Sequence, residues 1–347
     1  MDELISQLEK YTSISPKGHK AFDEYLKEKF DEYCELPILN TLLIPTEREV
    51  IEDLCDRILR AVRMALNGFP HKAFPELWNG LKMNLYTKSI RSFRSFYRMR
   101  IVEDKRGVDV DDLFHIPFTK QGIVKTQRYS VPGLPCLYLG LSLYGCWEEL
   151  GRPAINTCLF SRFQNNQDFT VLDFRPPSLG AGEDEKRNFL LIMPLIIACS
   201  IRVQNEMDFF KPEYIVPQLV LEAIPEINKC NAKTDKSKTI GIGYRSVCQN
   251  SEFGFTRDKF DNIVIPAHRN GDKFDQELCN LFRLTKPTCE EYERIRHWNV
   301  IFDGGDFDNF DNNNFGDNYT NTAFGQLESY ISDESIFPLQ NVVNDDV

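Results

Sequence analysis

The sequence has no cluster of basic residues. Its 347 residues carry a formal net charge of −11, and the last 47 of them hold ten acidic residues and no lysine or arginine. The first 300 residues are therefore close to neutral, with a net charge of −1. Nonspecific binding to nucleic acids requires clustered lysine and arginine side chains that displace counterions from phosphates. The sequence therefore argues against a nucleic-acid partner, although a small basic pocket for one ligand is compatible with it.

Long apolar runs and paired cysteines are also missing. The longest apolar run, residues 189–201, is interrupted by Pro194 and is shorter than the roughly 20 residues of a membrane span, which argues against a membrane partner. The chain begins with an acidic, amphipathic stretch instead of a basic segment followed by an apolar one, which argues against secretion. The ten cysteines form no Cys-X-X-Cys pair, so we expect reduced, mostly buried thiols in a cytoplasmic protein.

Two signatures of bound cofactors are absent as well. No group of histidines, cysteines and acidic residues has the spacing of metal ligands, so the sequence predicts no metal. The pair Gly241 and Gly243 lacks the third glycine and the following helix of a dinucleotide-binding loop, which argues against a Rossmann fold. We therefore expect no resident cofactor.

The chain falls into three segments. Residues 1–92 carry apolar side chains at helical spacing and predict a helical extension, in which Asn67-Gly68 ends one helix. Residues 93–298 predict an α+β domain with a mixed sheet, whose strands we expect at 136–141, 170–174, 239–246 and 262–265. Residues 299–347 form an acidic tail rich in Asn and Asp, which we expect to be disordered, above all at 303–321. Cutting the chain after about residue 300 is therefore expected to leave a folded, active protein.

Residues 127–150 are the most informative segment. Prolines and a glycine predict a turn, Cys136–Leu141 an apolar strand, and Ser142 the N-cap of a short helix. The helix is expected to bury Leu143, Cys146, Trp147 and Leu150 on one face. This face places Glu149 at its boundary and points Glu148 outward. Small residues one and two turns before Glu149, Gly145 and Ser142, are expected to leave room for a ligand beside this carboxylate.

An ordered series of short motifs resembles the RES domain, a family named for its Arg, Glu and Ser. The series runs through Phe96-Tyr97-Arg98, Gln127-Arg128-Tyr129-Ser130, Leu137-Tyr138-Leu139-Gly140, Glu149, Tyr214-Ile-Val-Pro-Gln218 and Ile240-Gly-Ile-Gly-Tyr-Arg-Ser246. It covers somewhat more than half of the chain. The sequence departs from the compact members of the family in its helical extension, in its acidic tail, and in having Arg-Tyr-Ser where many relatives have Arg-Trp-Asn.

The resemblance implies a fold like that of the ADP-ribosyltransferase toxins and a site that takes NAD as its substrate. It implies that Glu149 stabilises the charge that develops on the ribose, that Arg98 and Arg128 bind phosphate, that Tyr138 faces nicotinamide, and that Ser246 orients the ribose or phosphate. Each residue has a structural alternative. Tyr138 could belong to the core, Ser246 could bond the backbone, and Arg98 could pair with Glu103 or Asp104. His115, the histidine nearest these motifs, is expected to make a structural hydrogen bond.

Three functions follow from the resemblance. The first is an enzyme that cleaves NAD with inorganic phosphate or water as acceptor, and so arrests growth as a toxin or defence effector. The second is a protein ADP-ribosyltransferase, which shares the first half of that reaction. The third is a noncatalytic interaction protein on a RES-like scaffold. Because many RES proteins are toxins paired with a small antitoxin, the resemblance also implies an inhibitory partner protein.

Overall fold

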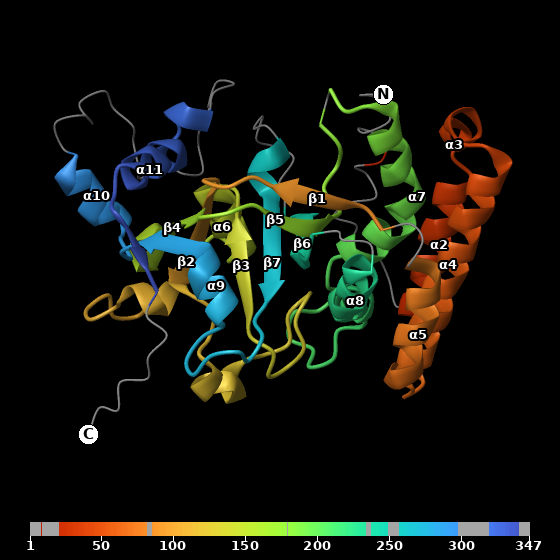
Figure 1. Ribbon diagram of the computed structural model, residues 1–347, viewed down its shortest axis with the longest axis horizontal. Helices are drawn as coiled ribbons and strands as arrows, with labels where there is room; N and C mark the ends of the chain where they lie inside the picture. Colours follow the sequence, from red (N-terminus) through yellow and green to blue (C-terminus); the bar gives the residue numbers. More distant parts are fainter. Residues whose placement is uncertain are drawn as a thin grey trace. The chain divides into compact units, whose positions relative to one another are not determined.

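A computed structural model describes residue 8 and residues 21–81, 85–178, 180–233, 237–248, 257–297 and 319–339. The chain divides into two compact units that alternate along the sequence (Figure 1). The first unit comprises Met1–Lys88, Lys125–Pro132 and Thr170–Gly243, and the second comprises Ser89–Val124, Gly133–Phe169 and Tyr244–Val347. The predicted segments, by contrast, followed one another along the chain.

The first unit begins with the helical extension that the sequence predicts. Its helices are α2 (Phe22–Cys34), α3 (Pro37–Leu42), α4 (Pro45–Leu66) and α5 (Pro70–Leu81), and α4 packs against both α2 and α5 (Figure 1). Prolines begin α3, α4 and α5, where the missing N–H has no helical partner to lose. Helix α4 ends at Asn67-Gly68 as predicted, because Gly68 adopts a φ of 84° that favours glycine.

Two apolar helices and three strands complete the first unit. Helix α7 (Glu183–Ser200) contains most of the long apolar run, and helix α8 (Ile215–Ala232) packs against it. The run is buried from Phe189 onward except at Leu191, which confirms that it is a core segment. Strands β5 (Phe169–Asp173) and β6 (Thr239–Arg245) pair in parallel, and β1 (Thr87–Ile90) lies next to β5. Within the described residues, no helix has the length and apolar character to cross a membrane.

The second unit holds an antiparallel sheet with the strand order β7-β3-β2-β4-β8-β9. Its strands are β2 (Ser95–Ile101), β3 (Cys136–Gly140), β4 (Cys158–Asn165), β7 (Asp261–Pro266), β8 (Phe282–Thr285) and β9 (Ile336–Pro338). Its helices are α6 (Leu143–Glu149), α9 (Gln276–Leu281), α10 (Glu290–Arg296) and α11 (Ala323–Ser332). Short 3-10 turns lie at Val110–Leu113, Phe118–Ile123, Ile155–Thr157, Arg257–Phe260 and Tyr319–Asn321, and a further one, Pro212–Tyr214, lies in the first unit.

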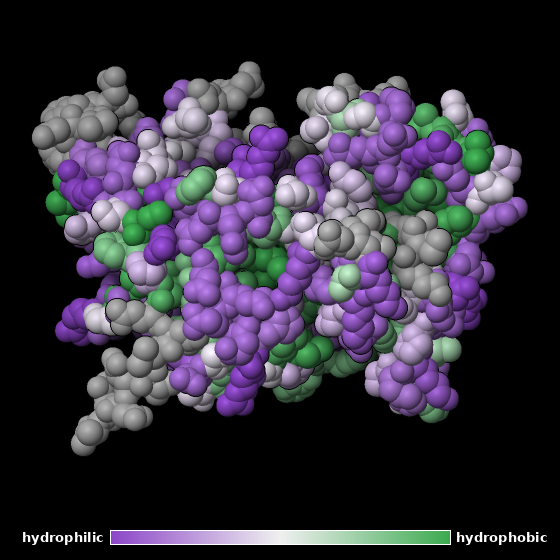
Figure 2. All heavy atoms as spheres, in the orientation of Figure 1, coloured by the Kyte–Doolittle hydropathy of each residue, from purple (hydrophilic) through white to green (hydrophobic). Residues whose placement is uncertain are grey.

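The observed elements confirm the α+β class and the four predicted strand positions. The likeness to ADP-ribosyltransferases stays a prediction. Six of the ten cysteines are buried, as expected for structural thiols, and all ten are free. Hydrophilic residues cover most of the face of the molecule that Figure 2 shows.

The acidic tail is partly folded, which corrects the prediction that residues 299–347 are disordered. Residues 319–339 form a 3-10 turn, helix α11 and strand β9, and β9 pairs with β8 at the edge of the sheet. The prediction failed because Phe324, Leu327 and Ile331 recur at helical spacing and supply a buried face within a polar composition. Residues 298–318, which include most of the stretch with the strongest prediction of disorder, lie outside the described residues.

Candidate functional site

Helix α6 places the two adjacent carboxylates in opposite surroundings. Ser142 is its N-cap as predicted, since the hydroxyl accepts a hydrogen bond from the Gly145 amide at 2.8 Å. Glu148 is buried, with 5% of its surface exposed, whereas Glu149 is exposed. The prediction that Glu148 points outward is therefore wrong. The expected face was derived from apolar spacing alone, but α6 packs on the sheet, on the turn at Arg257–Phe260 and on α11, and six of its seven residues are buried.

Glu148 has a structural environment. The Tyr144 hydroxyl donates to Oε1, and the Arg152 guanidinium donates to both carboxylate oxygens at 2.8 and 3.0 Å. Arg152 can reach back because Gly151 adopts a φ of 77° and ends the helix with a turn. The charge of Glu148 is thus matched by a forked ion pair within the same turn of chain.

Glu149 lies beside residues from two other parts of the second unit. Its Oε1 accepts a hydrogen bond of 2.8 Å from Nδ2 of Asn262, at the start of β7, and its Oε2 lies 3.9 Å from Sγ of Cys248. The Cys248 amide in turn donates to Oγ of Ser246 at 3.0 Å. Glu149 and Ser246, which the sequence proposed as partners, are therefore linked through Cys248. Ser246 is buried and its hydroxyl accepts from a backbone amide, so the structural alternative, a strand-end hydroxyl that bonds the backbone, is also realised.

The room for a ligand that was expected beside Gly145 is already occupied. A Cβ at Gly145 would lie 2.6 Å from the carbonyl oxygen of Lys259, and the Ser142 hydroxyl donates to that same oxygen at 2.5 Å. The close approach instead explains why glycine is needed there. Gly140, at the end of β3, has a similar role, because a Cβ would lie 2.7 Å from Sγ of Cys146 and 3.2 Å from Oδ1 of Asn262.

Arg98 on β2 is a half-buried cation that no carboxylate balances among the described residues. Its Nη1 donates to the carbonyl of Tyr138 at 3.0 Å, and its Nε is buried without a hydrogen-bond partner. The suggested pairing with Asp104 does not form, because Asp104 pairs with Arg106. Burial, and next the like charge of Arg100, lower the pKa of Arg98 to about 10. These surroundings are more typical of an arginine that binds an anionic ligand than of one held in a structural ion pair.

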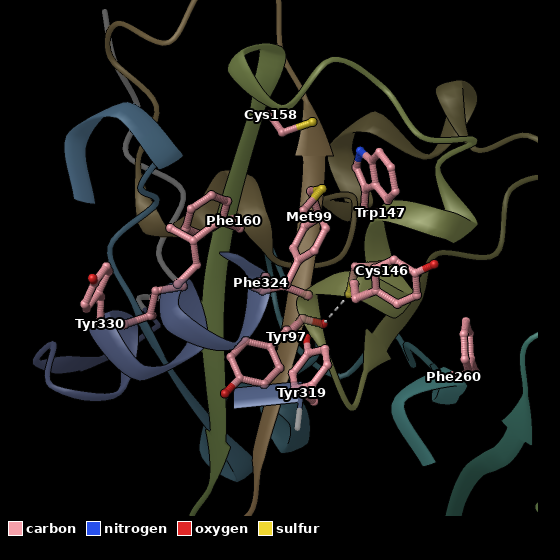
Figure 3. Packing of buried hydrophobic residues seen from close by; sticks show 14 residues of the cluster. Tyr97, Met99, Cys146, Trp147, Cys158, Phe160, Phe260, Tyr319, Phe324 and Tyr330 are labelled. Carbon is pink, nitrogen blue, oxygen red and sulfur yellow. Dashed lines mark hydrogen bonds between the residues drawn. The ribbon is translucent and has the colours of Figure 1, made fainter. Parts of the chain in front are cut away.

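Cys146 connects the surroundings of Arg98 and Glu149. Its thiol is buried and donates to the carbonyl of Tyr97 at 3.3 Å (Figure 3). The pKa of Cys146 is raised to about 12, chiefly by burial, and the smaller contributions include the negative charge of Glu149, which raises it, and the positive charge of Arg98, which lowers it. Both charged side chains therefore lie within electrostatic range of one thiol. Tyr138 is half-buried on β3, opposite Val264 of β7, and its proposed contact with nicotinamide stays a prediction.

Arg128 belongs to the first unit and has a structural function there. Its Nη1 donates to the carbonyls of Cys199 and Ile201, at the C-terminal end of α7, at 2.9 and 2.8 Å. Its guanidinium also lies 5.4 Å from the centre of the Tyr214 ring. Nε2 of Gln218 bonds the same loop through Thr126, Gln127 and Ser130 at 3.0 to 3.2 Å. Two motifs that are separated in sequence, 127–130 and 214–218, therefore meet in one unit.

With these positions known, comparison with other proteins locates the chain in a family. It is 32% identical over 311 residues to "Putative toxin YopC" of Bacillus subtilis (strain 168), and the match covers 80% of this chain and 68% of that protein. The chain belongs to the same family as YopC. No family model matches the chain, and no solved structure matches it.

In this member of the YopC family, His115 makes the structural hydrogen bonds that the sequence predicts. Its Nδ1 lies 2.9 Å from the carbonyl of Ile116, and its Nε2 accepts from the Asp275 amide at 3.0 Å. Burial lowers the pKa of His115 to about 4, so the ring is neutral. Within the part of the chain that the structure describes, no three His, Cys, Asp or Glu side chains are grouped as metal ligands.

Asn262 and Cys248 were missed in the sequence. Asn262 lies in a predicted strand, and its register opposite Gly140 is what brings its amide to Glu149. The available signal was a polar residue at the end of an otherwise apolar strand, in Asn262-Ile-Val-Ile265. Cys248 lies two residues beyond Ser246 and carried no signal of its own.

Proposed function

We propose that the chain is a toxin that cleaves the nicotinamide–ribose bond of NAD, with inorganic phosphate or water as the acceptor. The name of its relative YopC supports the toxic role. The resemblance of its motifs to the RES domain supports NAD as the substrate. Loss of cellular NAD would then arrest growth.

The observation that carries the proposal is the state of Arg98. Arg98 is half-buried, but its Nε is fully buried without a hydrogen-bond partner, which is costly unless an anion completes its surroundings. Its Nη1 is anchored on a neutral carbonyl and its Nε has no partner, so the fork retains donors for a phosphate oxygen. NAD supplies two phosphates. We therefore assign Arg98 to the pyrophosphate or to an incoming phosphate.

Glu149 is the residue that we propose for the chemical step. Departure of nicotinamide leaves positive charge on the ribose, and a fixed carboxylate stabilises such charge. The neutral amide of Asn262 donates to Oε1 of Glu149, and Cys248 contacts both Glu149 and Ser246. We propose that Ser246 orients the ribose or phosphate and that Tyr138 faces the nicotinamide ring. For Arg128, phosphate binding would come in addition to its contacts at the end of α7.

The test uses the purified full chain, its Glu149→Gln variant and an Asp333→Asn control, which removes one exposed acidic charge at the end of α11. Each is incubated with NAD, with and without phosphate. We expect nicotinamide release from the natural protein and the control, and at least about a hundredfold slower release from Glu149→Gln. Phosphorylated ADP-ribose identifies phosphate as the acceptor, free ADP-ribose identifies water, and label on protein identifies an ADP-ribosyltransferase. Absence of nicotinamide release at any enzyme concentration would refute the proposal and favour a noncatalytic interaction protein.

A further inference from the structure

Helix α11 packs directly on the helix that carries Glu149. The ring of Phe324 lies 5.4 Å from that of Trp147 and 5.5 Å from that of Tyr144, centre to centre. Tyr319, just before α11, belongs to the same buried cluster (Figure 3). A segment from the acidic tail therefore forms one wall of the core around α6.

Glu328 makes a polar contact from this wall to the first residue of α6. Its Oε1 accepts from the amide of Leu143, the first residue of the helix, at 2.6 Å across 185 residues of sequence. The Tyr319 hydroxyl donates to the same oxygen at 2.5 Å. Glu328 is buried, with 9% of its surface exposed. A buried acid with two donors at these distances is held in one position.

The first turn of α6 depends on contacts from outside the helix. A helix of seven residues is too short to be stable alone, and its first amides have no partner within the helix. Ser142 takes the amide of Gly145, and Glu328 takes that of Leu143. Glu149 follows Leu143 by six residues, about 9 Å along the helix axis at the usual rise. A shift of the first turn would therefore move Glu149 relative to Asn262.

We propose that Glu328 is a positioning residue, which fixes α6 through the Leu143 amide and thereby sets the place of Glu149. The C-terminal segment 319–339 then helps to position Glu149 in the second unit. The effect on activity rests on the proposed NAD cleavage, whereas the effect on α6 does not. Two independent measurements can therefore separate the two proposals.

The first measurement is amide hydrogen exchange of α6 in the natural protein, Glu328→Ala, Glu328→Gln and the Asp333→Asn control. We expect exchange at Leu143 and in the rest of α6 to be at least about tenfold faster in Glu328→Ala than in the control. Glutamine retains a carbonyl oxygen that can accept from Leu143, so Glu328→Gln should restore most of the protection. If Glu328→Ala does not fold, Glu328→Asp serves instead, because the side chain is one methylene shorter and withdraws the carboxylate from the Leu143 amide.

The second measurement is kcat and KM for NAD with the same variants. A positioning role predicts that Glu328→Ala lowers kcat at least about tenfold with KM changed by less than about threefold, and that Glu328→Gln recovers most of the loss. The proposal would be overturned if α6 exchanged at the same rate in Glu328→Ala and in the control. Where the alanine variant does not fold, the same comparison is made with Glu328→Asp. Faster exchange with kcat unchanged would also overturn the proposal. If the natural protein releases no nicotinamide, the proposed function fails, and the exchange result still decides whether Glu328 holds α6.

Discussion

Replacing Glu328 by glutamine should change how the stability of the protein depends on pH. Burial raises the pKa of Glu328 to about 7, against the opposing effects of the Tyr319 hydroxyl, the Leu143 amide and the positive charge of Lys259. Other titratable groups within electrostatic range are Tyr97 and Cys146, and burial keeps both of these neutral at physiological pH. The carboxyl group is therefore protonated in the folded protein at a pH where it is ionised in the unfolded chain.

The sign and the size of the effect follow from this difference. An acid whose pKa is raised on folding contributes most below its unfolded pKa of 4.5, and the contribution is lost as the pH rises to about 7. The difference of 2.5 pKa units, at about 1.4 kcal/mol for each unit, corresponds to about 3 kcal/mol. Glutamine cannot ionise, so any fixed cost of this substitution is the same at every pH.

The assay is urea unfolding of the natural protein, Glu328→Gln and Asp333→Asn at pH 5 and pH 8, followed by tryptophan fluorescence. Trp147 lies in the same buried cluster as α11 and reports on this part of the unit. Relative to the natural protein, Glu328→Gln should gain up to about 3 kcal/mol between pH 5 and pH 8. Asp333→Asn should show no such gain. Parallel pH profiles for the natural protein and Glu328→Gln would mean that Glu328 is ionised in the folded state, and would refute the reasoning.

Three further results are expected. Glu148→Gln should cost on the order of 3 kcal/mol of stability in urea unfolding, because it breaks a buried ion pair with Arg152. Glu149→Gln should leave stability nearly unchanged and slow nicotinamide release. The reverse pattern would exchange the roles of the two residues. Ending the chain at residue 300 should destabilise the second unit, since α11 and β9 are lost, and a cooperative, fully active truncated protein would contradict the packing. Arg128→Ala should cost about 1 to 3 kcal/mol by leaving two carbonyls at the end of α7 unpaired, with Arg128→Lys intermediate. If Arg128 also binds phosphate, calorimetry should show NAD affinity falling about 10- to 100-fold, and unchanged affinity would leave a structural role alone.

Local patterns predicted the elements that local interactions determine. The end of α4 at Asn67-Gly68, strand β3 and the N-cap Ser142 were all correct, because each depends on residues within one or two turns of chain. The structural hydrogen bond predicted for His115 was also correct, since an isolated histidine among aromatic residues has few other ways to be buried.

The errors concern contacts between segments that are far apart in sequence. Glu148 was expected to face solvent because apolar spacing alone does not show that α6 packs on several elements or that Arg152 folds back to pair with this carboxylate. Asn262 was missed because only the pairing of β7 with β3 brings it to Glu149. Composition misled the assignment of the tail, where four apolar positions at helical spacing outweigh a surplus of acidic residues.

Arg98 and Arg128 were assigned the same phosphate-binding role from the sequence, but they lie in different surroundings. Arg128 meets the last carbonyls of α7, where helix ends lack partners and favour positive charge, so its position is explained without a ligand. Arg98 has only one carbonyl contact for its guanidinium, keeps a buried Nε without a partner, and meets no carboxylate among the described residues. Folding alone would favour an apolar side chain at such a position. Such a residue is kept where binding of a ligand offsets its cost to folding. Arg98 is therefore the stronger candidate to bind the anionic part of the proposed substrate.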